Sequence, residues 1–318
     1  NVILILIFKL DIEALYISVI AGNFVQIFLI ERNIKPLKNF KVKDISKTLI
    51  NKMVKFSMPI AITTISFWLL TGYSKVLISH KLGMSDNGIF AIGMRFASAL
   101  TMIVSVLQMS WHEFSFSIIE DENKKKYYSK GIELFFKSIL AGIILVIPAT
   151  KIVFPYFVAN EYYNATYIMP TIYLYTAMNA FSGFVSTQFL AEKDSKTTLY
   201  STIVAALLNV ILSNMLIEKY ELLGITLALL ISFSVNMLIR MFLLNRKFNI
   251  KLLKKDIFYA LILIIICTII YYTSNIIGNV LMLIVSIIIS FIILQDEIIF
   301  LINKLKVMLK GKLQKRKK

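Results

Sequence analysis

The chain has 318 residues, of which 58% are hydrophobic and only 17% charged, and its formal net charge at pH 7 is +17. Soluble domains carry about 25% charged residues, and single hydrophobic cores stop growing near ~250–300 residues, so the composition excludes an ordinary globular protein. The apolar excess predicts an integral membrane protein whose surface faces lipid. The single cysteine, Cys267, excludes a disulfide framework and a cysteine metal site.

Apolar stretches near the ~20 residues needed to span a bilayer follow one another along the chain. The first, Asn1–Phe8, lacks the basic leader of a signal peptide, so we expect the chain to begin in mid-fold, at the end of a preceding helix. Nine spans are predicted after it: residues 12–30, 56–79, 86–108, 132–157, 165–190, 199–217, 222–244, 257–272 and 277–294. The sequence therefore predicts an all-α integral membrane protein with about ten transmembrane helices, one of them partial.

The distribution of lysine and arginine predicts the orientation of these helices. When alternate loops are assigned to opposite sides, 29 of the 35 basic residues fall on one side, in the segments 32–55, 124–137, 193–196, 240–255 and 304–318. Such asymmetry across short loops marks the cytoplasmic side, which includes the C-terminal tail. We expect these cations to contact anionic lipid head groups rather than nucleic acid, because the basic tail has no interleaved aromatic residues.

Three further basic residues fall in the opposite loops, which leaves three cations, Lys75, Arg95 and Lys151, all within predicted spans. Lys75 lies roughly 7 Å from the nearer end of its span and can snorkel to the interface, whereas Arg95 lies roughly 13 Å deep. Lys151 has a similar depth, in a helix that Pro148 and Pro155 are expected to break. A cation at such depth costs at least ~2.5–3.5 kcal/mol, so it should face a polar cavity or a partner. No carboxylate lies deep within a span, which makes these residues candidates for binding an anion; carbonyls, water or carboxylates elsewhere are the alternative.

The sequence predicts no enzyme activity, cofactor or metal site. No pair of carboxylates lies within a span, and the sequence contains no zinc-protease, nucleophile-elbow or phosphate-loop motif. His80 and His112 are isolated, and each is expected to be an interfacial side chain. The external loops are too short to form a catalytic domain.

The segment Lys55–Phe114 carries a series of specific motifs. It contains Lys55, Phe56 and Pro59, then Ser74 and Lys75 at the position of a D-R-Y-type element, then Leu82–Gly83, Asn87–Phe90, Arg95 and Trp111–Phe114, followed later by Glu161, Tyr162 and Ala165. This pattern resembles the polysaccharide flippases, the O-antigen and capsule repeat-unit exporters of the multidrug/oligosaccharidyl-lipid/polysaccharide exporter superfamily. Ser74 departs from the acid that family members often have there, which weakens the inference about Lys75 more than that about Arg95.

The resemblance implies a fourteen-helix protein with two six-helix lobes and two further helices, of which this chain would hold the last ten. Residues 1–31 would end the N-terminal lobe, and residues 32–54 would form a basic cytoplasmic loop between the lobes. Residues 55–244 would form the second six-helix lobe and residues 245–298 the two extra helices. Residues 299–318 would be a basic cytoplasmic tail.

The resemblance also implies export of undecaprenyl-diphosphate-linked oligosaccharide repeat units across the bacterial cytoplasmic membrane by alternating access. A polysaccharide polymerase and chain-length machinery would then be partners in surface polysaccharide synthesis. Arg95 would be the foremost diphosphate contact, followed by Lys75 and then Lys151. Three alternatives remain: a drug/cation antiporter of the same superfamily, which would need membrane carboxylates; a membrane polysaccharide polymerase or glycosyltransferase, which would need a long external loop; and a scaffold that recruits partners through its basic tail.

Overall fold

A computed structural model describes residues 4–5, 9, 12–35, 46–250 and 254–299. The chain divides into two compact units, Asn1–Lys55 and Phe56–Lys318, which we describe separately. Within the described ranges, the regular elements are α-helices and one short 3-10 turn, η2 (Asn160–Tyr162). The all-α fold class is therefore confirmed.

The first unit contains α2 (Ile12–Ile34) and the first residues of α4 (Lys47–Lys81). α2 matches the first predicted span and extends it by one turn. The initial apolar run and most of the predicted loop before α4 lie outside the described residues. α4 begins at Lys47, nine residues before the apolar stretch that was predicted to span the bilayer.

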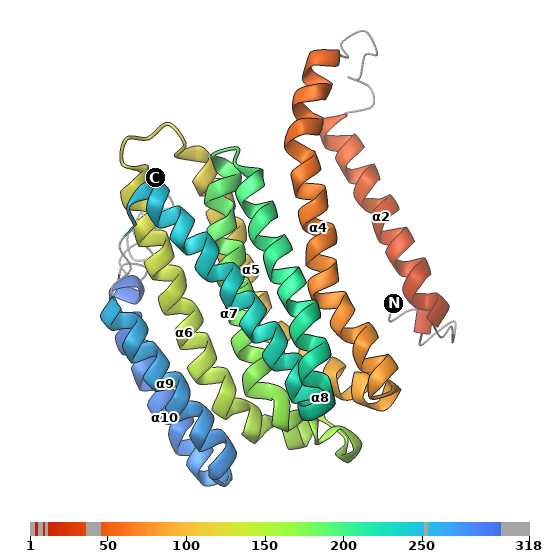
Figure 1. Cartoon of the computed structure of the whole chain (residues 1–318), viewed down its shortest axis with the longest axis vertical. Helices are drawn as coiled ribbons and strands as arrows, with labels where there is room; N and C mark the ends of the chain where they lie inside the picture. The colour runs from red at the N-terminus through yellow and green to blue at the C-terminus, as the bar shows by residue number, and fades with distance from the viewer. Residues whose placement is uncertain (1–3, 6–8, 10–11, 36–45, 251–253, 300–318) are drawn as a thin grey trace, which may run out of the picture. The chain divides into compact units, whose positions relative to one another are not determined.

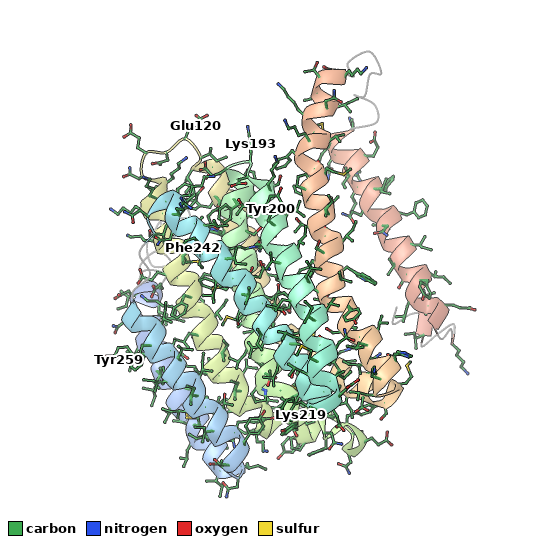
Figure 2. All side chains as sticks on the ribbon, in the orientation of Figure 1. Glu120, Lys193, Tyr200, Lys219, Phe242 and Tyr259 are labelled. Carbon is green, nitrogen blue, oxygen red and sulfur yellow. The ribbon has the colours of Figure 1, made fainter. Side chains whose placement is uncertain are left out.

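The second unit contains the remaining helices, and each of the other predicted spans corresponds to one of them. They are α4 from Phe56 onward, α5 (Met84–Ser117), α6 (Lys124–Phe157), α7 (Ala165–Ala191), α8 (Ser195–Phe248), α9 (Lys254–Thr273) and α10 (Ile276–Ile293). The helices run roughly along one direction, with α9 and α10 side by side against α6 (Figure 1). Figure 2 shows Glu120 and Lys193 at one end of this unit and Lys219 at the other, which is the alternation that the loop assignment requires.

The helix α8 is two antiparallel arms rather than one rod. Its 54 residues would extend ~81 Å if straight, far more than a bilayer. Glu221 has a left-handed backbone, with φ 48° and ψ −129°, and breaks the helix there. A Cβ atom on Gly224 would lie 2.3 Å from the carbonyl oxygen of Leu216, so the second arm begins against the end of the first. These arms are the predicted spans 199–217 and 222–244.

Length and composition alone identify five helices in the described chain that could cross a membrane, or six when α5, which is bent by 43° near its middle, is included. This number is below the prediction for three reasons. The two arms of α8 are counted together, α7 carries many polar residues, and the apolar part of α9, Ile257–Thr273, is shorter than the other helices. Of the 27 residues of α7, 20 are buried, so this helix contacts other helices rather than lipid and does not need an apolar surface.

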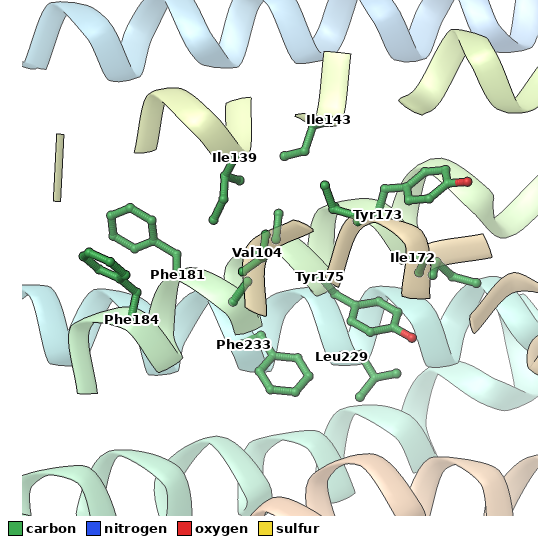
Figure 3. Close-up of a cluster of buried hydrophobic side chains, with 14 of the residues drawn as sticks. Val104, Ile139, Ile143, Ile172, Tyr173, Tyr175, Phe181, Phe184, Leu229 and Phe233 are labelled. Carbon is green, nitrogen blue, oxygen red and sulfur yellow. The ribbon is translucent and has the colours of Figure 1, made fainter. Parts of the chain in front are cut away.

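The core of the second unit is centred on α7, which packs against α5, α6 and α8. Figure 3 shows Tyr173, Tyr175, Phe181 and Phe184 of this helix among aliphatic and aromatic side chains of its neighbours. The ring of Phe184 stacks on that of Phe135 with centroids 4.0 Å apart. Membrane helices associate through such close packing, because lipid provides little hydrophobic driving force between them.

One expectation about α6 is wrong. Pro148 and Pro155 were predicted to break the helix, but α6 continues through both to Phe157. Membrane helices tolerate proline where neighbouring helices and local adjustments satisfy the freed backbone groups. Pro148 is buried in the packed interior, where such neighbours are present.

Candidate functional site

Four polar residues of α5 lie along one exposed side of that helix. Arg95, Ser98, Ser105 and His112 are all exposed, and their spacings of three and seven residues place them on the same side. We call these four residues the α5 stripe. The opposite face of α5, which includes Phe90 and other buried apolar residues, packs into the core. The exposed side of α5 also carries Met102, Val106 and Met109, so it is mixed, and the deep guanidinium of Arg95 is the feature that requires water or a polar partner there.

Arg95 supplies the positive charge of the stripe. Its side chain is exposed and has no hydrogen bond or ion pair within the described ranges. Only its backbone is engaged, since the carbonyl oxygen accepts a hydrogen bond from Ser98 Oγ at 2.5 Å. A guanidinium facing hydrocarbon at this depth would be costly, so the position favours a water-filled cavity or an anionic ligand.

Lys75 lies on α4 in an open recess of about 520 Å³. The recess is also lined by Ser79 and Asn87, whose side chains join α4 to α5 by a 2.8 Å hydrogen bond from Asn87 Nδ2 to Ser79 Oγ. Asn87 precedes Arg95 by eight residues, or ~12 Å along the helix. Lys75 is therefore placed near one end of the helix that carries the stripe, but no contact between Lys75 and Arg95 is observed in the described chain.

Ser74, the neighbour of Lys75, points into the protein. It is fully buried, and its hydroxyl oxygen accepts a 3.3 Å hydrogen bond from Asn209 Nδ2, which also donates to the carbonyl oxygen of Leu70 at 2.9 Å. These contacts fix α4 against the first arm of α8. Of these two consecutive residues on α4, Ser74 therefore packs against α8 and Lys75 lines the recess.

Lys151 is separated from the other two cations. It is half-buried on α6, and its Nζ lies 5.1 Å from the centroid of the Tyr271 ring on α9. The Tyr271 hydroxyl donates to the carbonyl oxygen of Thr166 at 2.9 Å, so the ring is held in place. A cation–π contact already stabilises this ammonium group, and the structure does not bring it into the α5 stripe.

Arg240 is a buried cation that the sequence analysis misplaced. It was assigned to a basic cytoplasmic loop, but the structure buries it in the second arm of α8 with only 5% of its surface exposed. It donates to Ser201 Oγ at 2.8 Å, the Ser182 carbonyl oxygen at 2.8 Å, Thr202 Oγ1 at 2.7 Å and the Thr198 carbonyl oxygen at 3.3 Å. All four acceptors are neutral, and they belong to α7 and the first arm of α8. Arg240 therefore joins three helical segments, and its donors are used for packing rather than for a ligand.

Trp111, from the last specific motif of the hairpin, is also a packing residue. Its ring stacks on Phe184 with centroids 4.9 Å apart, and a Cβ atom on Gly131 would lie 2.0 Å from the indole. The glycine lets α6 approach α5 closely at this point.

No family model and no curated protein matches the sequence. Among solved structures, the fold is similar to that of the lipid II flippase MurJ in an inward closed conformation, with a TM-score of 0.54 and 21% sequence identity. Over the matched region, the chain has the same fold as this protein. The similarity covers 76% of this chain and 53% of MurJ, so the chain spans about half the length of that protein. The prediction of an all-α, multi-pass membrane fold is confirmed by this likeness to MurJ.

Proposed function

We propose that this chain is part of a flippase that moves oligosaccharide repeat units, linked through a diphosphate to undecaprenol, across the bacterial cytoplasmic membrane. Transport by alternating access would supply surface polysaccharide synthesis, with the C-terminal tail in the cytoplasm. Two features support this proposal: the likeness to MurJ, a flippase for another lipid-linked substrate, and the motifs between Lys55 and Phe114.

The observation that carries the proposal is the guanidinium of Arg95, which is exposed on α5 and has no hydrogen bond or ion pair within the described chain. A diphosphate concentrates negative charge, and its attraction to a cation strengthens as water is excluded from a cavity. The planar fork of arginine suits two phosphate oxygens at once, which lysine cannot reproduce. Arg95 would thus hold the diphosphate while the glycan follows the head group through the cavity.

Lys75 and Lys151 have smaller roles in this proposal. Lys75 is exposed in an open recess near one end of the same helix, where it would attract the diphosphate on arrival or departure. Lys151 would contribute least, because the Tyr271 ring already stabilises its charge. The expected order of importance is therefore Arg95, Lys75 and Lys151.

The proposal is tested by Arg95→Ala in the full-length protein, with surface-polysaccharide display measured at matched membrane levels of the protein. We expect export to fall at least ~tenfold, since a hydrogen bond to a charged group contributes about 1.5–3 kcal/mol. Lys81→Ala is the matched control. It also removes one exposed positive charge, but Lys81 is paired with Glu218 at 3.2 Å and lies at the end of α4, away from the stripe.

Normal export by Arg95→Ala at a normal protein level would contradict the diphosphate contact. The variant Arg95→Lys separates two parts of the argument. Partial export would support both charge and bidentate geometry, whereas full export would show that charge alone suffices.

A further inference from the structure

A second polar recess lies at the other end of the α5 stripe, between α5 and α7. It has a volume of about 490 Å³ and is lined by Ser105, Gln108, Met109, His112, Glu113, Gly183, Thr187 and Leu190. Ser105 and His112 belong to the α5 stripe, so the recess is continuous with the face that carries Arg95. Of its lining, His112 and Glu113 fall within the motif Trp111–Phe114, and the proposed diphosphate contact does not account for the recess.

The chemistry of the lining suits a neutral, hydroxyl-rich ligand rather than a phosphate. No lysine or arginine lines the recess, and the carboxylate of Glu113 would repel an anion. Carboxylate, amide, hydroxyl and imidazole groups together offer both donors and acceptors, which sugar hydroxyls can use in either role. The ring of His112 lies over that of Phe116 with centroids 4.8 Å apart, which adds an aromatic border.

Gln108 is held in a fixed orientation at the centre of the recess. Its Nε2 donates to the carbonyl oxygen of Ala180 at 2.7 Å, which joins α5 to α7. Its Oε1 has no hydrogen-bond partner within the ranges that the structure describes, so it remains an acceptor whose position the other half of the amide fixes. Preorganisation of this kind lowers the entropy that a ligand's hydrogen bond must overcome.

Gly183 keeps the recess open on the α7 side. A Cβ atom at this position would lie 3.2 Å from Gln108 Nε2, closer than most real contacts of this type. Glycine within a helix costs about 0.5–1 kcal/mol relative to alanine, so its presence in α7 requires a local reason. The space that it leaves beside Gln108 supplies that reason.

The distance to Arg95 fits a ligand with two chemically different parts. Ser105 lies ten residues beyond Arg95 and His112 seventeen residues beyond it, or ~15 Å and ~25 Å along α5. The bend of 43° in α5 makes the direct distances shorter. An extended chain of several sugars attached to a diphosphate has this polarity, with the anion at one end and hydroxyl groups along the rest.

We infer that the recess between α5 and α7 binds sugars of the oligosaccharide distal to the diphosphate while the diphosphate is held at Arg95. This inference rests on the proposed function and adds the part of the protein that distinguishes a long glycan from a short one. In this arrangement, Arg95 binds the diphosphate common to all such lipids, and the recess binds the sugars beyond it.

The test uses the full-length protein in proteoliposomes and two fluorescent probes, a polyprenyl diphosphate carrying one sugar and the same lipid carrying a complete oligosaccharide. Gly183→Leu should fill the recess and slow translocation of the oligosaccharide lipid roughly tenfold relative to the single-sugar lipid, as expected for one or two lost hydrogen bonds. Glu113→Gln, which keeps the shape of an exposed side chain, should have a selective effect of a few-fold. Arg95→Gln should slow both lipids alike.

Ser110→Leu is the matched control, since it adds the same side chain at an exposed position of α5 outside the recess. Thermal unfolding of each purified variant establishes that it is folded, and if Gly183→Leu is not, Glu113→Gln alone decides. The inference is wrong if the folded recess variants slow both lipids equally or slow neither while the wild-type protein moves both. If the wild-type protein moves neither lipid, the proposed function fails, and the inference fails with it.

Discussion

The helices α5 and α10 each expose one face, and the two faces differ in the charged and polar side chains that they carry. The exposed residues of α10 are all apolar: Ile276, Ile277, Val280, Leu281, Ile284, Val285, Ile287, Ile288, Phe291 and Ile292. The exposed face of α5 instead mixes Arg95 and several hydroxyl side chains with Met102, Val106 and Met109. Both faces are exposed in the structure, so side-chain chemistry must distinguish lipid from water. The wholly apolar face of α10 suits hydrocarbon, whereas the deep arginine on α5 requires water or a polar partner.

The buried faces of the two helices show the reverse pattern. α10 buries Asn279, Ser286 and Ser290, whereas α5 buries apolar residues such as Phe90 and Leu100. A helix in lipid places its polar and small residues against other helices, because hydrocarbon offers them no partners. A helix beside water buries its apolar side as a soluble helix does. The contrast indicates different surroundings for the two exposed faces, hydrocarbon along α10 and a polar medium beside Arg95.

Adding an arginine to each exposed face tests whether the two faces meet different surroundings. Ile284→Arg places a charge near the middle of α10 and should destabilise the membrane-inserted protein by ~2.5–3.5 kcal/mol. Ser98→Arg places the same side chain on the α5 stripe and should cost less than ~1 kcal/mol, because water can solvate it. The amount of monodisperse protein extracted from membranes measures both effects. Equal losses for the two variants would show that the stripe does not face water.

The number and order of the helices could be predicted from the sequence because the bilayer sets the length of an apolar span. The break within α8 was also predictable, since Glu218, Lys219 and Glu221 interrupt the apolar residues there. The ends of the helices were less predictable. Charged residues end an apolar stretch without ending a helix, and α4 and α8 continue beyond their spans.

The same effect explains the error about Arg240. It lies close to the end of an apolar stretch and was therefore grouped with the following basic loop. α8 continues to Phe248, so Arg240 is two turns from the helix end and meets hydroxyl groups of Ser201 and Thr202 almost forty residues earlier in the chain. The position of Arg240 inside the predicted span 222–244 was the signal in the sequence that could have shown it to be buried in a helix.

For the candidate site, depth and the lack of a nearby carboxylate were enough to select Arg95. The ring that holds Lys151 could not be predicted, because Tyr271 is distant in sequence and only the packing of α9 on α6 brings it close. The second recess could not be predicted for the same reason. Its lining comes from α5 and α7, and the contribution of Gly183 is the absence of a side chain at a point of helix contact.

Arg240 and Arg95 differ in their partners. Protein groups accept the hydrogen bonds of Arg240, whereas the Arg95 side chain has no such partner within the described chain. Arg240→Met should lower the free energy of unfolding by about 1–3 kcal/mol, since it leaves buried hydroxyl and carbonyl groups without their donor. Arg95→Met should change it by no more than ~0.5 kcal/mol, because no contact within the described chain is lost. Thermal unfolding of the purified proteins without ligand tests both. The reverse order would mean that Arg95 has a structural partner and is not free to bind an anion.

The smallest expected effect tests what covers α10. Ile144 is fully buried in α6, and Ile144→Val should destabilise the protein by about 0.5–1.5 kcal/mol because the interior cannot fill the space of the lost methyl group. Ile284 is 50% exposed on α10, and lipid chains can fill the same space, so Ile284→Val should have almost no effect on the unfolding temperature in lipid nanodiscs. If Ile284→Val instead destabilises the protein as much as Ile144→Val, protein must cover this face of α10. The lipid-facing and water-facing sides would then have to be assigned again, because an apolar exposed face would no longer indicate hydrocarbon.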